Sequence, residues 1–297
     1  MKVRPPLNKD YITYHIESSQ AKDIDPSNDC LRYVADRFEL NLEQRYWLAF
    51  LFGTCYSATM VYYVYNEFPD YENVNVDRLQ RWWDTNKHKT LFQTDRLRVK
   101  TQDKFVETFV SYKSLLAGRS QAAHFASLRQ PTRQNTYDNC YSNLSQIKNF
   151  GRFTMFIYLE MVHVLTGYEL EPTYLDLKNA ESCRNGLVYH LGHYELDTHG
   201  NDRKLSKKHI DYLQYKFKEL KRQIEQYDIQ HTNIWNIETT LCAYKKYEKG
   251  KRYIGYYIDR QKKEIEKMQN NVSEGVDWSP LWDFRQETYD RKWLKEL

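Results

Sequence analysis

A short basic segment, residues 93–100, contains the first side chains that could do chemistry. In its sequence, QTDRLRVK, Arg96, Arg98 and Lys100 occupy alternate positions. Alternate side chains of an extended chain point to one side, so these cations could bind one anion, and Arg can contact phosphate through two N–H groups at once. Asp95 could act as a base or hold a metal ion there. The plainer alternative is a surface loop in which Asp95 pairs with its basic neighbours.

A second candidate lies around residues 153–166, which are strongly apolar. Arg152 precedes this stretch, and Glu160 and His163 lie within it, three residues apart and therefore on one face of a helix. A carboxylate or imidazole among apolar neighbours is costly unless it is hydrogen-bonded or functional. We interpret His163 as a core histidine and Glu160 as the better candidate for a general base. Arg152 is a candidate for binding the substrate.

A third candidate, residues 179–190, combines a guanidinium, an amide and an imidazole in Arg184, Asn185 and His190. His190 could take a proton from a nucleophile, and Arg184 could bind a carboxylate. The same residues resemble the Arg-x(4–6)-His motif of HEPN ribonucleases, which are also all-helical. No metal site is predicted, because no standard zinc finger has the spacing of Cys183, His190, His193 and His199.

A fourth candidate, residues 252–260, interleaves cations with aromatic rings near the C-terminus. Helical spacing would place its hydroxyl and guanidinium groups on adjoining faces. Flat rings can stack on nucleic-acid bases while Arg binds phosphate, so the segment is a candidate substrate-binding surface. Packing against the preceding helix would explain some of these rings equally well. The residues concerned are Arg252, Tyr253, Tyr256, Tyr257 and Arg260.

The elements that would position these groups are predicted to be helices. Apolar residues recur at helical spacing in several stretches, and Gly or Pro follows some of them. Asn41 is expected to cap the longest helix and Pro69 to end it. Strand signals are weak, because the only Asn-Gly pair is not flanked by alternating apolar runs. Helices are predicted over about 42–68, 103–116, 153–166, 205–230, 237–247 and 254–269.

The composition narrows the class of protein. The 297 residues include 15% aromatic residues, with 26 Tyr, but only 10 Gly and 7 Pro, which excludes collagen-like and disordered classes. Five cysteines without a CxxC pair indicate free thiols in a reducing compartment. Residues 46–65 lack charge over a length that could span a bilayer, but five Tyr and several other hydroxyl residues favour a buried helix and no membrane association.

The net charge of +4 hides an asymmetry. Residues 1–80 contain 8 Lys and Arg against 12 Asp and Glu, so the rest of the chain carries a net charge of +8. Clustered cations beside aromatic rings suit a polyanion, although solvated helix faces explain charge clusters equally well. We predict an all-α fold: a single compact multi-helical unit with a basic C-terminal part. An N-terminal extension, 1–30, would precede a helical domain, 31–297.

Several short motifs, in order along the chain, resemble those of the bacteriophage amino acid:DNA transferases, also called α-glutamyl/putrescinyl thymine pyrophosphorylases. Each motif is short, but their common order makes the resemblance fairly specific, and it covers about residues 30–290. The motifs are residues 47–53, 66–70, 93–96, 151–152, 184–187 and 255–260.

The resemblance implies an enzyme that hypermodifies thymine in double-stranded DNA, in the cytoplasm of the infected bacterial host. In that family, the amine of a free amino acid, commonly glycine, displaces pyrophosphate from 5-pyrophosphomethyl-deoxyuridine and forms a C–N bond. The leaving pyrophosphate needs Arg, Lys or a metal ion, so no cofactor is certain but a divalent cation such as Mg²⁺ could take part. The amine needs a base, for which the candidates are Glu160, His190 and Asp95.

Two other functions stay open on the sequence alone. An HEPN-like ribonuclease would cleave RNA with Arg184 and His190. A non-enzymatic nucleic-acid-binding protein would bind DNA in a salt-sensitive way and form no product.

Overall fold

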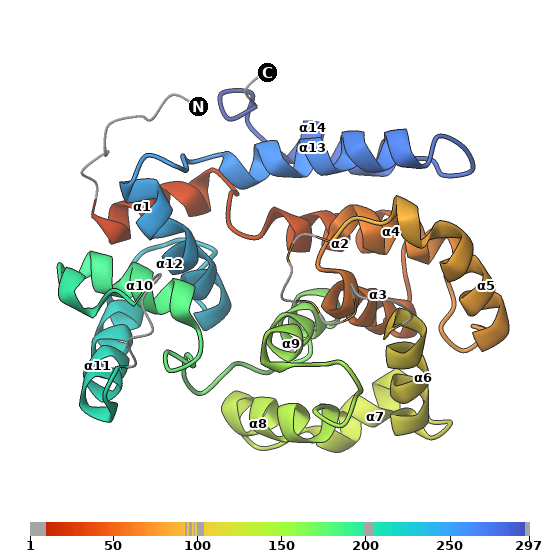
Figure 1. Ribbon diagram of the computed structural model, residues 1–297, viewed down its shortest axis with the longest axis horizontal. Coiled ribbons are helices and arrows are strands. Elements are labelled where there is room, and N and C mark those ends of the chain that lie inside the picture. Colours follow the sequence, from red (N-terminus) through yellow and green to blue (C-terminus); the bar gives the residue numbers. More distant parts are fainter. Residues whose placement is uncertain are drawn as a thin grey trace. The chain divides into compact units, whose positions relative to one another are not determined.

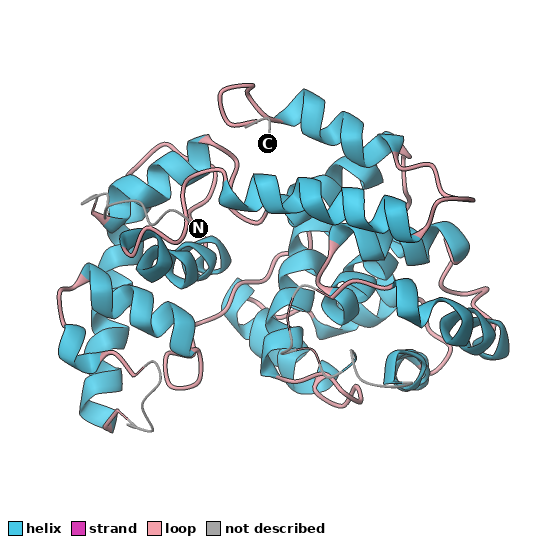
Figure 2. Ribbon diagram, turned by 45° about the horizontal axis from the view of Figure 1, so that its top comes forward, coloured by secondary structure: helices cyan, strands magenta, loops and turns pink. Residues whose placement is uncertain are grey.

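Polar caps and glycines divide the chain into α-helices joined by turns and loops (Figure 1, Figure 2). The computed structural model describes residues 10–92, 94, 97, 99, 104–198 and 205–294, and within these residues no strand occurs. The predicted all-α class is confirmed. The helices group into unit 1, Met1–Pro26, Tyr174–Arg260 and Tyr289–Leu297, and unit 2, Ser27–Thr173 and Gln261–Thr288. The boundary predicted between residues 30 and 31 stays a prediction.

Unit 1 combines the N-terminal helix with helices from the second half of the chain. The division between the units runs through α13, whose first residues belong to unit 1. The elements of unit 1 are α1 (Tyr11–Gln20), α10 (Glu181–His190), η3 (Tyr194–Leu196), α11 (Lys207–Ile224), α12 (Ile234–Glu248) and the start of α13 (Tyr256–Asn271).

The first helix, α1, packs on α12 through buried polar groups. Tyr11 Oη lies 2.7 Å from Thr240 Oγ1, and His15 Nδ1 lies 2.8 Å from the same oxygen. His15 Nε2 also lies 2.7 Å from the carbonyl oxygen of His231. Burial lowers the pKa of His15 to about 4, so this imidazole is neutral near pH 7. Paired polar side chains therefore fix α1 in unit 1.

Unit 2 contains most of the remaining helices. It is built around α3 and α9, which pack closely at Gly53, where an added Cβ would lie 2.8 Å from Tyr158 Cβ. Its elements are α2 (Pro26–Arg37), α3 (Leu42–Cys55), α4 (Ala58–Glu67), α5 (Val76–Asn86), η1 (Lys87–Lys89), α6 (Lys104–Leu116), α7 (Gln121–Leu128), α8 (Arg133–Leu144), α9 (Arg152–Thr166), the rest of α13 and α14 (Ser279–Thr288).

Aromatic rings fill much of the core of unit 2. Phe50 stacks on Tyr112 with ring centroids 4.1 Å apart, and the Tyr158 hydroxyl donates a hydrogen bond of 3.1 Å to the Tyr112 oxygen. Trp47 is fully buried and donates from Nε1 to the Phe68 carbonyl at 2.7 Å. Tyrosine and tryptophan can be buried in this way because each polar tip has a partner. Part of the tyrosine excess is therefore structural.

The prediction of one continuous helix over residues 42–68 is wrong, because the structure has two helices there. Tyr56 adopts a left-handed conformation, with φ +49°, and ends α3. Ser57 then accepts a hydrogen bond from the Met60 backbone and begins α4 as its N-cap. Ser57 is followed by helix-forming residues, so a capping signal was present within the uncharged run. The predicted burial is confirmed, and Asn41 caps α3 with Gln44 in a capping box, as expected.

The other five predicted helices are confirmed, with ends that differ by a few residues. They are α6, α9, α11, α12 and α13. Gly167, with φ +68°, ends α9 as predicted, because glycine adopts this conformation without the strain of a side chain. The apolar patterns of the sequence do not predict the other helices, α1, α2, α5, α7, α8, α10 and α14.

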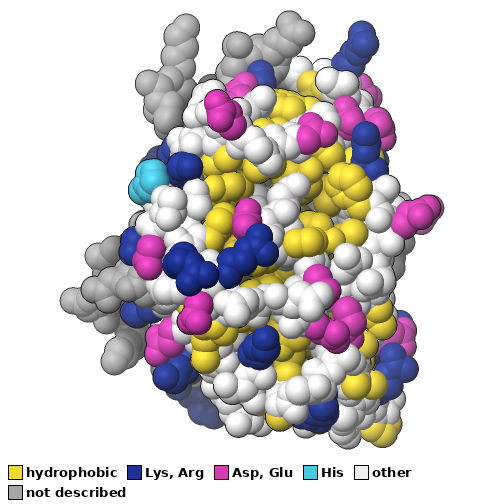
Figure 3. Space-filling model, turned by 90° about the vertical axis from the view of Figure 1, so that its right-hand side faces the viewer, with side chains coloured by type: hydrophobic (Ala, Val, Ile, Leu, Met, Phe, Trp, Pro, Cys, Tyr) yellow, Lys and Arg dark blue, Asp and Glu magenta, His cyan; other side chains and the backbone are white. Residues whose placement is uncertain are grey.

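Many surface cations are paired with carboxylates. Figure 3 shows one face on which Lys and Arg lie among Asp, Glu and apolar side chains. In the basic stretch 111–152, Lys148 Nζ lies 3.2 Å from Glu107 and Arg133 Nη2 lies 2.6 Å from Glu169. Exposed pairs of this kind contribute less than about 1 kcal/mol each, and they reduce the number of cations left for a polyanion. Among the described helices, none has the length and apolar character needed to cross a bilayer.

Candidate functional site

The predicted aromatic and cationic segment forms a single cluster in unit 1, at the start of α13. Arg252 Nη1 donates a hydrogen bond to the Tyr257 hydroxyl. The guanidinium carbon lies 4.8 Å from the ring centroid of Tyr256 and 4.7 Å from that of Tyr257. Tyr253 meets Tyr256 edge to face at 5.9 Å. All four side chains are half-buried, so the structure brings these predicted residues together beside solvent. Arg260, also half-buried, follows Tyr256 by one helical turn.

Next to this cluster, the side chain of Asp23 binds the N-terminus of α13. Its carboxylate accepts hydrogen bonds from the backbone N–H groups of Gly255 at 2.8 Å, Tyr257 at 2.9 Å and Ile258 at 3.0 Å. Gly255 has φ +95°, a conformation that an L side chain would strain. Burial raises the pKa of Asp23 to about 7, although the three N–H donors oppose this rise. Asp23 is thus an acid that can exchange a proton near neutral pH.

A second buried carboxylate, Asp259, lies one turn into α13. The Tyr253 hydroxyl donates a hydrogen bond to Asp259 Oδ2. Asp259 is 4% exposed, and its Oδ1 is buried without a hydrogen-bond partner. Leaving a buried acceptor unpartnered costs about 1–3 kcal/mol, which makes this oxygen a candidate acceptor for a substrate proton. Burial and the neighbouring Asp259 raise the pKa of Tyr253, so its hydroxyl keeps its proton at neutral pH.

Neither carboxylate is predicted to be a site residue from the sequence. Asp23 lies 232 residues from Gly255 and only the folded chain brings them together. For Asp259 a signal existed, since the acid lies within the basic and aromatic segment itself, six residues after Tyr253.

His190, a predicted base, ends α10 beside the aromatic rings of α1. Its ring lies 5.5 Å from that of Tyr11, which in turn meets Tyr244 at 5.3 Å. Burial lowers the pKa of His190, while the charge of Asp10 partly opposes this effect. The imidazole is therefore mainly neutral near pH 7 and able to accept a proton. A role in catalysis stays a prediction.

Arg184 and Asn185 have clear structural contacts within unit 1. Arg184 Nη1 donates to the carbonyls of Leu177 and Lys178, each at 2.8 Å, and Nη2 donates to Thr198 Oγ1 at 2.7 Å. Asn185 Oδ1 accepts from the Thr198 backbone at 3.4 Å. Both side chains therefore fix loops against α10. Arg184 Nε is buried without a hydrogen-bond partner. A contact between Arg184 and a substrate carboxylate stays a prediction.

The remaining predicted residues lie in unit 2 or outside the described residues. Glu160, 6% exposed on α9, accepts a hydrogen bond of 2.9 Å from Asn28 Nδ2, which satisfies part of its buried carboxylate. Arg152 is the half-buried first residue of α9. His163, expected to be a core histidine, places Nδ1 3.1 Å from the Tyr168 carbonyl oxygen. Outside the described residues lie Asp95, Arg96, Arg98, Lys100 and His199.

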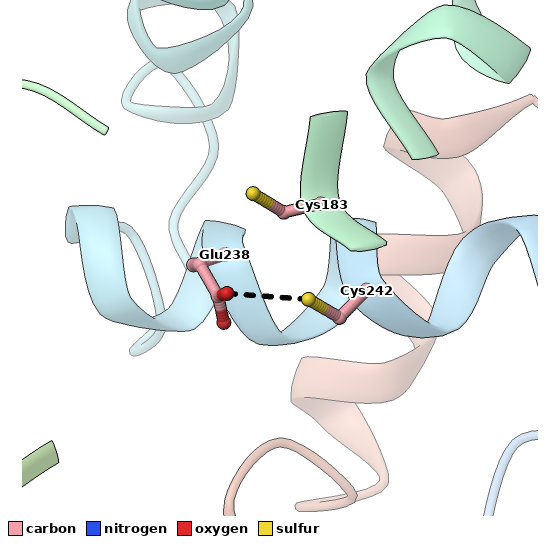
Figure 4. Close-up of side chains that lie close together, drawn as sticks. All are labelled: Cys183, Glu238 and Cys242. Atoms are coloured by element: carbon pink, nitrogen blue, oxygen red, sulfur yellow. Dashed lines mark hydrogen bonds between the residues drawn. The ribbon is translucent and has the colours of Figure 1, made fainter. Parts of the chain in front are cut away.

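One group of possible metal ligands occurs among the described residues: Cys183, Glu238 and Cys242 in unit 1 (Figure 4). Their ligand atoms all lie within 4.8 Å of one another. Two thiols make this group unsuited to Mg²⁺, which prefers oxygen ligands. This group differs from the four residues considered as zinc ligands in the sequence, because Cys183 lies beside Glu238 and Cys242 of α12.

Comparison with known proteins identifies the class of this helical protein. The model of the amino acid:DNA transferase family matches residues 19–253. The chain belongs to this family, as its motifs suggested. A serinyltransferase of Salmonella phage ViI is 28% identical to the chain over 263 residues, which is 82% of the chain and 63% of that protein. The chain therefore spans less than two thirds of the length of this relative. No solved structure matches the chain.

Proposed function

We propose that this protein transfers an amino acid to a modified thymine in DNA. The amine nitrogen would bond to the methylene carbon of 5-pyrophosphomethyl-deoxyuridine, while the bond from that carbon to the pyrophosphate oxygen breaks. The leaving pyrophosphate takes the bonding electron pair, and a base takes the amine proton. The observation that carries this proposal is the family match over residues 19–253.

The cluster at the start of α13 supports a role in binding the modified base. Arg252 can donate N–H groups to pyrophosphate oxygens, where negative charge grows as the bond breaks. The half-buried rings of Tyr256 and Tyr257 can stack on a base, which must leave the helix of double-stranded DNA to react. The cations predicted from the sequence, Arg96, Arg98, Lys100 and Arg152, are the alternatives to Arg252 in this role. A divalent cation such as Mg²⁺ would bind to the pyrophosphate oxygens themselves.

The amino-acid substrate needs a proton acceptor and a cation. Asp259 supplies a buried carboxylate oxygen without a partner, beside Tyr253. We propose that the ammonium group of the substrate binds there and loses its proton, with Glu160, His190 and Asp95 as the alternatives to be compared. Arg184, in the same unit as Asp259, would bind the substrate carboxylate, and Arg152 is the alternative if Glu160 of its own unit is the base.

The preferred amino acid is proposed to be glycine, and serine is the competitor, since the phage ViI relative is named a serinyltransferase. Both are small amino acids. The reaction would take place in the cytoplasm of an infected bacterium, where phage DNA is copied.

The test is to mix the protein with duplex DNA that contains 5-pyrophosphomethyl-deoxyuridine and with single amino acids, then to identify the nucleosides by mass spectrometry. We expect a nucleoside that carries glycine, together with released pyrophosphate. DNA with the hydroxymethyl base, which lacks the leaving group, is the control and should stay unchanged. Unchanged pyrophosphorylated DNA with every amino acid would reject the proposal, and salt-sensitive DNA binding alone would then favour a non-enzymatic protein. No structural observation favours the HEPN-like ribonuclease.

Variants separate the candidate bases. Asp259→Asn, His190→Gln and Glu160→Gln each remove one proton acceptor and nearly conserve the size of the side chain. We expect the first to lower turnover about 100-fold or more, within the range typical of general-base catalysis, and the other two to lower it less. Full activity of Asp259→Asn would mean that another candidate, Glu160, His190 or Asp95, is the general base.

A further inference from the structure

The fold brings two thiols and a carboxylate together at the closest approach of α10 and α12. At Gly186 of α10, an added Cβ would lie only 1.9 Å from the carbonyl oxygen of Leu241, so the two helices are nearly in backbone contact. Cys183 precedes Gly186 by one turn, and Cys242 directly follows Leu241. The small interhelical distance places the two sulfur atoms close together.

Glu238 completes the group from the same face of α12. It precedes Cys242 by four residues, the spacing that places two side chains one above the other on a helix. The Cys242 thiol donates to Glu238 Oε1 at 3.2 Å (Figure 4). The Cys183 thiol donates to the Ala180 carbonyl at 3.2 Å. Cys183 is fully buried, whereas Glu238 and Cys242 are half-buried. Solvent can therefore reach the group from the side of α12.

These positions are close to those in a tetrahedral zinc site. Zn–S bonds of about 2.3 Å and Zn–O bonds of about 2.0 Å place neighbouring ligand atoms about 3.5–3.8 Å apart. The three ligand atoms already lie within 4.8 Å of one another, so small rotations of side chains would suffice to enclose an ion. Soft thiolate ligands select zinc over magnesium or calcium.

We propose that Cys183, Cys242 and Glu238 bind Zn²⁺, with water as the fourth ligand. Each thiol loses its proton to solvent on binding, so one Zn²⁺ ion replaces two protons. Two thiolates and one carboxylate give the site a charge of −3, which the ion reduces to −1. Three protein ligands leave one tetrahedral position open, on the half-buried side.

The test measures how much added Zn²⁺ the 297-residue chain binds, after its thiols have been reduced and any bound metal has been removed with a chelator. We expect one Zn²⁺ per chain, release of two protons per ion, and a thiolate-to-cobalt charge-transfer band of two-thiolate intensity when Co²⁺ replaces Zn²⁺. Changing groups that only support a metal's ligands costs about 10- to 100-fold in affinity. Cys183→Ser and Cys242→Ser should therefore weaken zinc binding at least about 100-fold, and Glu238→Gln should weaken it while keeping the cobalt band.

Cys140→Ala is the matched control, since Cys140 is also a buried free cysteine but lies in unit 2. Its zinc affinity should equal that of the unchanged protein. If the serine variants fail to fold by circular dichroism, protection of Cys183 and Cys242 from alkylation by Zn²⁺ in the unchanged protein decides the question. A cobalt spectrum without thiolate bands, equal zinc binding by the Cys183→Ser variant, or a Cys183–Cys242 disulfide that forms while the reduced protein binds no zinc would overturn the proposal.

Discussion

At the residue scale, two buried carboxylates at the start of α13 have different surroundings. Asp23 accepts three backbone hydrogen bonds and so has a structural function at a helix end. Asp259 has a tyrosine hydroxyl on one oxygen and no partner on the other. The difference predicts that replacing Asp23 changes stability, whereas replacing Asp259 changes chiefly the chemistry.

The pKa of Asp23 predicts how pH acts on stability. The value rises from 3.8 to about 7 on folding because the carboxyl is buried. The folded protein keeps this proton where the unfolded chain has lost it, so the resulting stabilisation is complete below about pH 4 and is lost as the pH rises through about 7. The side chain of the Asp23→Asn variant cannot ionise, so this variant does not lose stability in this way as the pH rises. We expect its free energy of unfolding, relative to the unchanged protein, to increase from about pH 4 to about pH 7 in denaturant titrations.

Asp228→Asn is the control, because Asp228 is exposed in the same unit, and its relative stability should not follow this trend. A relative stability of Asp23→Asn that decreases over the same range would mean that the three N–H donors keep the carboxylate ionised.

Arg252 is predicted to stabilise the leaving pyrophosphate. Arg252→Ala removes N–H donors from the charge that develops in the transition state, and one such donor is worth about 100-fold or more in kcat. We expect a loss of this size in single-turnover assays, with the DNA fully bound. Lys251→Ala, which removes an exposed neighbouring cation, should keep nearly full activity. Equal rates for the two variants would remove Arg252 from the reaction.

Residues of the candidate site differ in how far the sequence could predict them. Arg252, Tyr253, Tyr256 and Tyr257 lie within six positions, so local spacing was sufficient to group them. Asp23 could not be grouped with them, because its contacts depend on the tertiary fold. Cys183 and Cys242 are likewise 59 positions apart and meet only because Gly186 allows two helices to touch.

At the element scale, apolar periodicity predicted several helices that bury apolar faces but missed α1, whose buried face is partly polar. The buried face of α1 includes His15, Ser18 and Ser19, and His15 is held by hydrogen bonds from other segments. No apolar pattern marks such a helix. In the run 42–68, by contrast, two thirds of the residues are apolar or aromatic, and the break at Tyr56 and Ser57 depended on one capping side chain.

The contact between α10 and α12 predicts the effect of a single methyl group. In Gly186→Ala the new Cβ would lie 1.9 Å from the Leu241 carbonyl oxygen, so the helices must separate. We expect a loss of about 1–3 kcal/mol in the free energy of unfolding, measured with denaturant, and weaker zinc binding. Ser182→Ala, which adds no atom to the same helix, should cost less. Unchanged stability of Gly186→Ala would mean that the contact is looser than described.

At the scale of the whole molecule, the sequence predicted the helical class but not how helices group. Residues 1–26 join residues 174–260 in unit 1, which depends on contacts between chain segments far apart. Folding also pairs charges of opposite sign. The basic stretch 111–152 contains cations that pair with carboxylates outside it, so the charge of the stretch by itself overstates the cations left for DNA.

This organisation predicts a modest salt dependence of DNA binding. The logarithm of affinity falls with the logarithm of salt concentration with a slope of about −0.9 for each phosphate contact that releases a counterion. Because the protein carries a net charge of only +4, we expect a slope that corresponds to a few contacts, measured by fluorescence anisotropy with unmodified duplex DNA. Arg252→Ala should reduce the slope by about one contact if this guanidinium binds a DNA phosphate. If Arg252 binds only the pyrophosphate of the modified base, the slope for unmodified DNA should stay the same and change only for the pyrophosphorylated substrate, which would locate the cation at the reacting group.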